Sequence, residues 1–147
     1  MTYSSPGQQF AGAWKLLSAV YERDGQQAFP FGQAPVGLLF YDAAGNMAVQ
    51  IMSRQYIEEG QQGRGQDGRA SFAGYLAYFG TYEIDAAASR IIHHVSGSTL
   101  AHWVGGIQTR QYHFPEEHHG DCLILSAPAT RDGQGAAAVL TWERLQP

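Results

Sequence analysis

The sequence predicts an all-β protein that folds as an antiparallel up-and-down barrel of about eight strands, with at most a short helical turn. Three observations favour this fold class. Short apolar segments recur along the chain with turn-forming residues between them, and none belongs to a long amphipathic helical pattern. The chain contains 18 glycines, which suit tight turns, and 8 tyrosines, which suit half-buried strands. Closure into a barrel would also remove the exposed edges that a flat sheet must protect.

The composition predicts one domain. A chain of 147 residues with 44% hydrophobic side chains can build a continuous core, so we expect residues 1–147 to form a single domain. The formal net charge is -4, from 9 basic and 13 acidic residues, and no window contains clustered basic residues. We therefore expect no binding of nucleic acid, whose phosphates require such clusters.

The sequence offers little indication of a targeting segment, a membrane helix or a disulfide. The N-terminal segment MTYSSPGQQF lacks a basic start and an apolar run of signal-peptide length, and other apolar runs fall short of the roughly 18 residues of a membrane helix. Cys122 is the only cysteine, so no intramolecular disulfide is available, and its neighbours in DCLILS predict a small buried side chain rather than a nucleophile. We expect a soluble cytoplasmic protein without membrane association.

The first strands are predicted before residue 53. The segment from Trp14, WKLLSAVYERDGQQAF, breaks at Asp24-Gly25, which is a strong hairpin-turn signal. VGLLFY and MAVQIM flank a second turn and are expected to pair as antiparallel strands. FPFGQAP, between these units, contains two prolines and a glycine, which favours a loop across the mouth of the sheet that borders a pocket.

The middle of the chain is ambiguous. Residues 58–70, EEGQQGRGQDGRA, combine Gly and Gln with almost no apolar anchor, so we expect a loop. Phe72, Tyr75, Leu76 and Phe79 then recur at helical spacing, whereas YFGTYEID resembles a strand. We predict a short helical turn that runs into a strand.

The second half completes a meander. RIIHHVS, HWVGGIQTRQYHF, DCLILSAP and AAAVLTWERL read as strands, and the turn segments DAAAS, GSTLA, PEEHHG and TRDGQG separate them. Counted from Trp14, the strands number about eight, at which a closed barrel has room for packed side chains or one small ligand.

Particular residues resemble a known family. Gly12-Ala13-Trp14 is similar to the G-x-W signature of the first lipocalin strand, and LTWERL supplies Arg144, like the basic residue that packs over that tryptophan. GAWKLLSAVYERDG, FPFGQAPVGLLFYDAAGNMAVQIM, AYFGTYEID, IIHHVSGSTLAHWVGGIQTRQY and LTWERL together resemble the bacterial and fungal lipocalin-like domain proteins. The resemblance implies a calycin-type antiparallel barrel with an internal cavity and leaves the ligand open. The segment 58–70 departs from the family pattern.

Strand parity constrains the histidines. His93 and His94 are adjacent, so in a strand they point to opposite faces and cannot both ligate one ion. Arg110 shares a face with Gln108 and Tyr112, and it stands in GGIQTR at a position that looks characteristic of the family. The resemblance therefore places Arg110 inward and favours His93 inward with His94 outward. Parity alone does not decide between the two histidines.

An inward arginine needs a partner, because an unpaired buried charge is costly. Arg110 is expected to meet a carboxylate such as Glu83 or Glu22, a cluster of carbonyl groups, or an anionic ligand. One interpretation is a polar patch of Arg110, His93 and either Tyr78 or Tyr82 inside an apolar cavity. The other is a satisfied hydrogen-bond network that closes the barrel bottom.

The same residues define a catalytic alternative, with His93, Arg110 and Tyr78 as the candidate residues. His93 with a pKa near its usual 6.5 would shuttle a proton while Arg110 stabilises developing negative charge. This chemistry suits a cofactor-free isomerase, cyclase or dehydratase.

Aromatic residues supply the candidate ligand contacts. His102 and Trp103 fall in a turn near a barrel end, where they would rim the entrance. Aromatic side chains suit a ring-containing ligand, although each is also explained as ordinary core. The candidate ligand-binding residues are Tyr21, Phe40, Tyr56, Tyr75, Tyr82, His102, Trp103 and Tyr112.

Several site classes are excluded by missing motifs. The segment HFPEEHHG matches neither H-E-x-x-H nor a Cys and His zinc pattern, so we expect no metal. G-x-S-x-G, a P-loop and a G-x-G-x-x-G after a strand are also lacking. We therefore exclude serine hydrolases, nucleotide-dependent enzymes and dehydrogenases as functional classes, and we expect no cofactor.

Three functional hypotheses remain. The first is binding of a small hydrophobic or aromatic molecule in the barrel cavity. The second is an isomerase or cyclase that acts on such a molecule in specialised metabolism, and the third is a filled barrel with a structural or interaction role. A homodimer through an exposed sheet face is compatible with all three, and nothing in the sequence selects that face.

Overall fold

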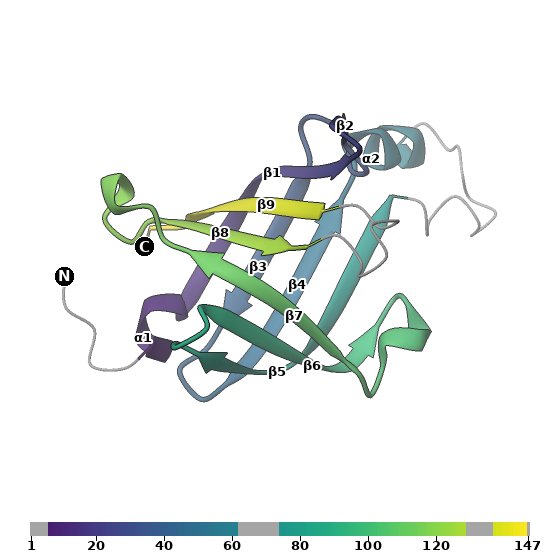
Figure 1. Cartoon of the computed structure of the whole chain (residues 1–147). Helices are drawn as coiled ribbons and strands as arrows, with labels where there is room; N and C mark the ends of the chain where they lie inside the picture. The colour runs from purple at the N-terminus through teal and green to yellow at the C-terminus, as the bar shows by residue number, and fades with distance from the viewer. Residues whose placement is uncertain (1–5, 62–73, 129–136, 147) are drawn as a thin grey trace.

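The described residues form one antiparallel sheet rolled into a barrel (Figure 1). The computed structural model describes residues 6–61, 74–128 and 137–146. Its strands are β1 (Gly12–Arg23), β2 (Gln26–Ala28), β3 (Val36–Tyr41), β4 (Asn46–Met52), β5 (Tyr75–Asp85), β6 (Arg90–Ser98), β7 (Ile107–His113), β8 (Cys122–Ala127) and β9 (Ala137–Arg144). Helices α1 (Pro6–Phe10) and α2 (Arg54–Gln61) and two single 3-10 turns, Ala101–Trp103 and Glu116–His118, complete the described elements.

Pairing between the first and last strands closes the barrel. From β3 to β9 each strand pairs with the next along the chain, and β1 pairs with β9 from Trp14 to Glu22. The other edge of β1 pairs with β3 near its start and with β2 near its end, so β2 extends a hairpin beyond the ring. The ring itself therefore has eight strands, and the predicted fold class is confirmed.

Alternation along each strand determines which side chains form the core. In β3 the buried positions are Gly37, Leu39 and Tyr41, and the intervening side chains are exposed. In β4 the inward side chains are Met47, Val49 and Ile51. Burial of these apolar surfaces is the main force that holds the barrel closed.

Helix α1 covers one end of the barrel. Phe10 is fully buried, and its carbonyl accepts a hydrogen bond of 2.9 Å from Nε1 of Trp14. The Arg144 guanidinium lies 4.2 Å from the centre of the Trp14 ring and donates to the carbonyls of Gln9 and Ala11. The predicted packing of Arg144 over Trp14 is confirmed, and it fastens α1 to the last strand. Helix α2 and strand β2 lie at the opposite end (Figure 1).

Two predictions in the middle of the chain are wrong. Residues 58–61, predicted as loop, belong to helix α2, whose first turn is capped by a hydrogen bond of 3.0 Å from the Tyr56 amide to Ser53 Oγ. Residues 62–70 and Phe72 lie outside the described residues. Tyr75 and Leu76 lie in β5 rather than in a helical turn, because they pair with β4 and tertiary pairing overrides local spacing. The strand predicted for YFGTYEID, which includes Phe79, is confirmed as part of β5. None of the described helices is long and apolar enough to cross a membrane.

Candidate functional site

A small cavity lies inside the barrel. Its volume is about 60 Å³, and strands β3, β4, β8 and β9 give it a mainly apolar wall. Phe31, from the loop between β2 and β3, and Trp103, from the 3-10 turn after β6, also line it. The polar side chains on its wall include Tyr78, His93 and Arg110, so the predicted inward position of Arg110 is confirmed.

His93 is held between two tyrosines. It is 2% exposed, and its Nε2 lies 2.7 Å from the Tyr41 hydroxyl while its Nδ1 lies 2.8 Å from the Tyr78 hydroxyl. His94 points outward, and its Nε2 lies 3.0 Å from Oε1 of Glu83. The favoured orientation of the two histidines is therefore confirmed.

Burial keeps His93 neutral. Desolvation, with a smaller contribution from the positive charge of Arg110, lowers the pKa of His93 from 6.5 to about 3. The expectation of a His93 pKa near 6.5 is wrong, because strand parity does not reveal how completely the imidazole is removed from water. A histidine with such a low pKa is a poor proton shuttle at neutral pH.

Tyr41, His93 and Tyr78 together carry three polar hydrogens, and the two hydrogen bonds between them use only two. A neutral imidazole carries one N–H and one bare nitrogen, and each tyrosine carries one O–H. The bare nitrogen accepts from one tyrosine, and the N–H donates to the oxygen of the other. The O–H of that second tyrosine is then free to donate elsewhere.

The surroundings decide which tyrosine has the free O–H. Tyr41 is 2% exposed and has no other side-chain hydrogen bond in the described part of the chain, so a free O–H there would be a buried unpaired donor. Tyr78 lines the cavity, where an acceptor can reach its oxygen. The favoured arrangement therefore has Nδ1–H of His93 donating to Tyr78 and Tyr41 donating to Nε2.

This arrangement predicts different effects for two matched substitutions. Tyr41→Phe leaves the Nε2 lone pair buried without a donor, and we expect a loss of about 2 kcal/mol in the free energy of unfolding. Tyr78→Phe is expected to cost about half as much, because His93 and Tyr78 both line the cavity, where another acceptor can replace the lost oxygen. Urea unfolding measures both values, and the ¹⁵N shifts of the imidazole report which nitrogen is protonated. A protonated Nε2 with the larger loss in Tyr78→Phe would contradict the assignment.

Arg110 has no carboxylate partner within the described residues. Its guanidinium donates to the Thr109 carbonyl at 3.0 Å and to Oε1 of Gln108 at 3.2 Å. Neither predicted partner pairs with it, since Glu83 contacts His94 and Glu22 forms no ion pair with it. Burial, opposed by the charge of Arg110, raises the pKa of Tyr78 to about 12, so Tyr78 stays protonated.

Trp142 contributes a further donor. Its side chain lines the cavity, and its Nε1 is buried with no hydrogen-bond partner among the described atoms. A buried donor without an acceptor costs about 1 to 3 kcal/mol. An acceptor that reached Nε1 would remove this cost.

Five of the eight candidate ligand-binding residues lie in three places. Tyr21 and Trp103 line the cavity, and the Trp103 ring packs edge-on against Tyr78 with centroids 5.6 Å apart. Tyr56 and Tyr75 stack near the α2 end, with centroids 6.4 Å apart. His102 is exposed beside Trp103.

Like Tyr56, Tyr75 and His102, the remaining three candidates lie away from the cavity wall. The Tyr82 hydroxyl donates to the Asp42 carbonyl at 2.6 Å, and Tyr112 packs edge-on against Phe10 near α1. Phe40 is 45% exposed on the outer face of β3. Its neighbour Tyr41 is the residue that contacts His93.

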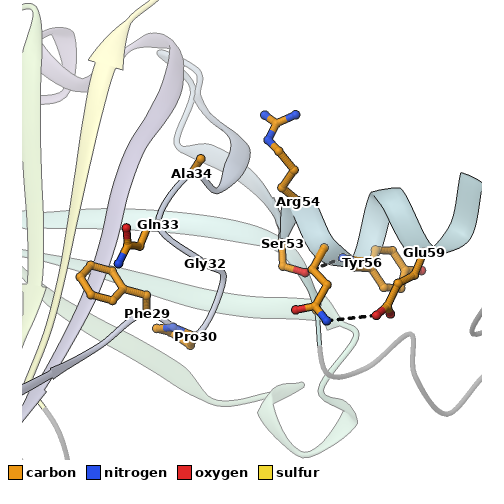
Figure 2. Close-up of a pocket in the computed structure, with 11 residues that line it drawn as sticks. Phe29, Pro30, Gly32, Gln33, Ala34, Ser53, Arg54, Tyr56 and Glu59 are labelled. Carbon is orange, nitrogen blue, oxygen red and sulfur yellow. Dashed lines mark hydrogen bonds between the residues drawn. The ribbon is translucent and has the colours of Figure 1, made fainter.

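A second hollow, of about 360 Å³, lies between the loop at residues 29–34 and the start of α2. Figure 2 shows Phe29, Pro30 and Gln33 on one side of it and Arg54, Tyr56 and Glu59 on the other. The prediction that FPFGQAP borders a pocket is confirmed. Phe31 of the same loop lines the barrel cavity. No group of three or more His, Cys, Asp or Glu side chains in the described segments is placed to hold a metal ion.

Comparisons with known proteins point to one family. Residues 11–145 match the family described as the lipocalin-like domain. A 4'-hydroxy-3'-methoxypropiophenone carrier protein of Aspergillus oryzae (strain ATCC 42149 / RIB 40) is 33% identical over 111 residues, covering 67% of this chain and 96% of the relative. Among solved structures, a redesigned β-barrel has a TM-score of 0.49 and 11% identity, covering 95% of both chains. A de novo designed fluorescence-activating β-barrel has a TM-score of 0.47 and 11% identity, covering 97% of this chain and 100% of the other.

Proposed function

Because this chain belongs to the lipocalin-like domain family, we propose that it binds a small aromatic molecule inside its barrel and acts as a carrier. The observation that carries this proposal is the polar patch of Tyr78, His93 and Arg110 on an otherwise apolar cavity wall. Apolar walls with a few placed polar groups are typical of small-molecule sites. The similarity to a carrier of an aromatic ketone supports the same function.

The wall and the patch suit different parts of one ligand. Leu39, Val49 and Leu125 offer apolar contact to a ring, and Trp103 adds an aromatic face at the mouth. Tyr78 and Arg110 offer hydrogen bonds to an oxygen substituent on that ring. A hydroxylated aromatic ketone has both features.

Binding requires the cavity to widen. Its volume of about 60 Å³ is well below the roughly 300 Å³ of the smallest pockets for drug-sized ligands. Phe31 lies in a loop and Trp103 in the 3-10 turn Ala101–Trp103, both outside the strands, so they can turn outward without breaking the barrel ladder. We propose that these two side chains move when the ligand enters.

The neutral state of His93 favours a carrier over an isomerase or cyclase. General base catalysis works best when the pKa of the base is near the working pH, and the pKa of His93 is about 3. No other histidine lines the cavity within the described residues. If a binding experiment finds no ligand, the hypothesis of a filled barrel is favoured instead.

Titration with 4'-hydroxy-3'-methoxypropiophenone tests the carrier function. Trp103 and Trp142 line the cavity, so ligand entry is expected to quench tryptophan fluorescence saturably. Arg110→Met removes the charged donor, and we expect at least a ten-fold loss of affinity, or about 1.4 kcal/mol. Arg90→Met, an exposed position on β6, is the matched control and should keep the wild-type affinity.

Two results would overturn the proposal. One is the absence of saturable quenching with this ketone and with a panel of related aromatic molecules, combined with native mass spectrometry that finds no molecule on protein from its own host. That result would favour the filled barrel. The other is an equal loss of affinity in Arg110→Met and Arg90→Met, which would move the contact away from the cavity.

A further inference from the structure

Three of the side chains that line the cavity carry hydrogen-bond donors. The hydrogen count around His93 leaves the Tyr78 O–H free, and the Tyr78 side chain lines the cavity. Nε1 of Trp142 meets no acceptor from the described part of the chain, and Arg110 uses two of its five N–H groups in the described contacts. Among the described residues these donors exceed the acceptors that reach them, and a ligand oxygen with several lone pairs would supply acceptors.

The cavity wall carries a positive charge in addition to its hydrogen-bond donors. Arg110 brings a permanent positive charge to the wall, and no carboxylate among the described side chains lines the cavity. A cation near a low-dielectric interior is stabilised by an anion much more than by a neutral group. The protein supplies no such anion within its described residues.

The neighbours of Arg110 do not neutralise it. Tyr41 and Tyr78 both have raised pKa values because they are buried, so neither forms a phenolate at neutral pH. His93 is neutral and adds no charge of either sign. Within the described residues no group supplies the negative charge that Arg110 favours, and an anionic ligand would supply it.

We propose that the cavity selects its aromatic ligand as an oxyanion, with the ionised oxygen facing Arg110 and the Tyr78 hydroxyl. This inference rests on the proposed carrier function and names the chemical class of its ligand. For a phenolic ligand, the O–H bond breaks, the electron pair stays on oxygen, and the proton goes to bulk water. His93 does not take that proton.

The same hydroxyaryl ketone provides a direct test, because its phenolate absorbs at longer wavelength than its neutral form. Bound 4'-hydroxy-3'-methoxypropiophenone is expected to show the phenolate band at a pH one unit below its pKa in water. The bound pKa should be lowered by at least about one unit, which is a ten-fold preference for the ionised form. The dimethoxy analogue, which cannot ionise, should bind at least ten-fold more weakly at a pH above that pKa.

Variants show whether the cavity causes the shift. Arg110→Met should restore the pKa of any ligand that still binds to its value in water, and Arg110→Lys, which keeps the charge, should preserve most of the shift. Tyr78→Phe removes one donor and should reduce the shift by part of its size. Arg90→Met keeps the cavity intact and should leave the shift unchanged.

The outcomes separate the two proposals. If neither the phenol nor its dimethoxy analogue binds, the carrier function fails. If both bind equally and the bound phenol keeps its neutral spectrum, the carrier function stands and the selection of an oxyanion is overturned. A phenolate band that survives in Arg110→Met would also overturn the role given to Arg110.

Discussion

Acidification from pH 6.5 to pH 3 is expected to lower the free energy of unfolding by about 4 to 5 kcal/mol through His93 alone. Burial lowers the pKa of His93 in the folded protein to about 3, while the unfolded chain keeps a value near 6.5. Between these values the unfolded state binds more protons than the folded state, so stability rises with pH. The stabilising effect is complete above about pH 6.5 and is lost, at about 1.4 kcal/mol per unit, as the pH falls to 3.

A pair of neighbouring substitutions isolates this effect from the titration of carboxylates. His93→Gln removes the titrating group and keeps an amide that can donate and accept, whereas His94→Gln makes the same change on the exposed face. Urea unfolding at several pH values should show a much shallower acid slope for His93→Gln than for wild type or His94→Gln. The comparison uses slopes, so a uniform loss of stability in His93→Gln does not affect it. Equal slopes in all three proteins would contradict the prediction.

The architecture was accessible from sequence because its signals are local and repeated. Alternating apolar segments and hairpin turns such as Asp24-Gly25 recur around the whole ring, so a few local errors do not change the strand count. The helix α2 was missed because Gly and Gln dominate the composition of residues 58–70. The cap at Ser53 is a local signal that would have found its start.

The inward face of β3 was harder to assign. Both faces of VGLLFY are apolar, so alternation fits Leu38 and Phe40 as well as Leu39 and Tyr41. The informative residue is Gly37, where an added Cβ would lie 2.9 Å from the Gln50 carbonyl oxygen and 3.1 Å from the Leu16 side chain. This glycine indicates the crowded inner face and would have identified Tyr41 instead of Phe40.

The electrostatics of the site depend on distances that no sequence pattern contains. The inward orientation of the His93 and Arg110 side chains was predicted from strand parity together with the family resemblance. The degree of burial and the two tyrosines on either side of the imidazole come from three strands, β3, β5 and β6, that meet only in the closed barrel. The low pKa of His93, and the lack of a carboxylate partner for Arg110 among the described residues, therefore depend on how the strands assemble in the barrel.

Gly80→Ala is expected to destabilise the protein by at least about 3 kcal/mol. A Cβ at this position would lie 1.8 Å from the His94 carbonyl oxygen and 2.9 Å from its carbonyl carbon. Both atoms belong to the backbone of β6, next to an irregularity in which Phe79 pairs with Gly97 and Gly80 pairs with Val95. Relief of the clash requires β5 and β6 to separate, which breaks ladder hydrogen bonds and moves Tyr78 away from His93.

Two other glycines provide a graded comparison by urea unfolding. At Gly97 an added Cβ would meet the Phe79 ring at 2.5 Å, and that exposed side chain can turn aside, so Gly97→Ala should cost about 1 kcal/mol. At Gly60, in helix α2, no atom lies within 4 Å, and Gly60→Ala should be neutral or stabilise by up to about 1 kcal/mol. If Gly80→Ala does not fold, this order still holds for the other two variants, and the clash is supported. If Gly80→Ala unfolds at the same urea concentration as Gly60→Ala, then β5 and β6 do not approach each other this closely, and the contact between Tyr78 and His93 loses its structural basis.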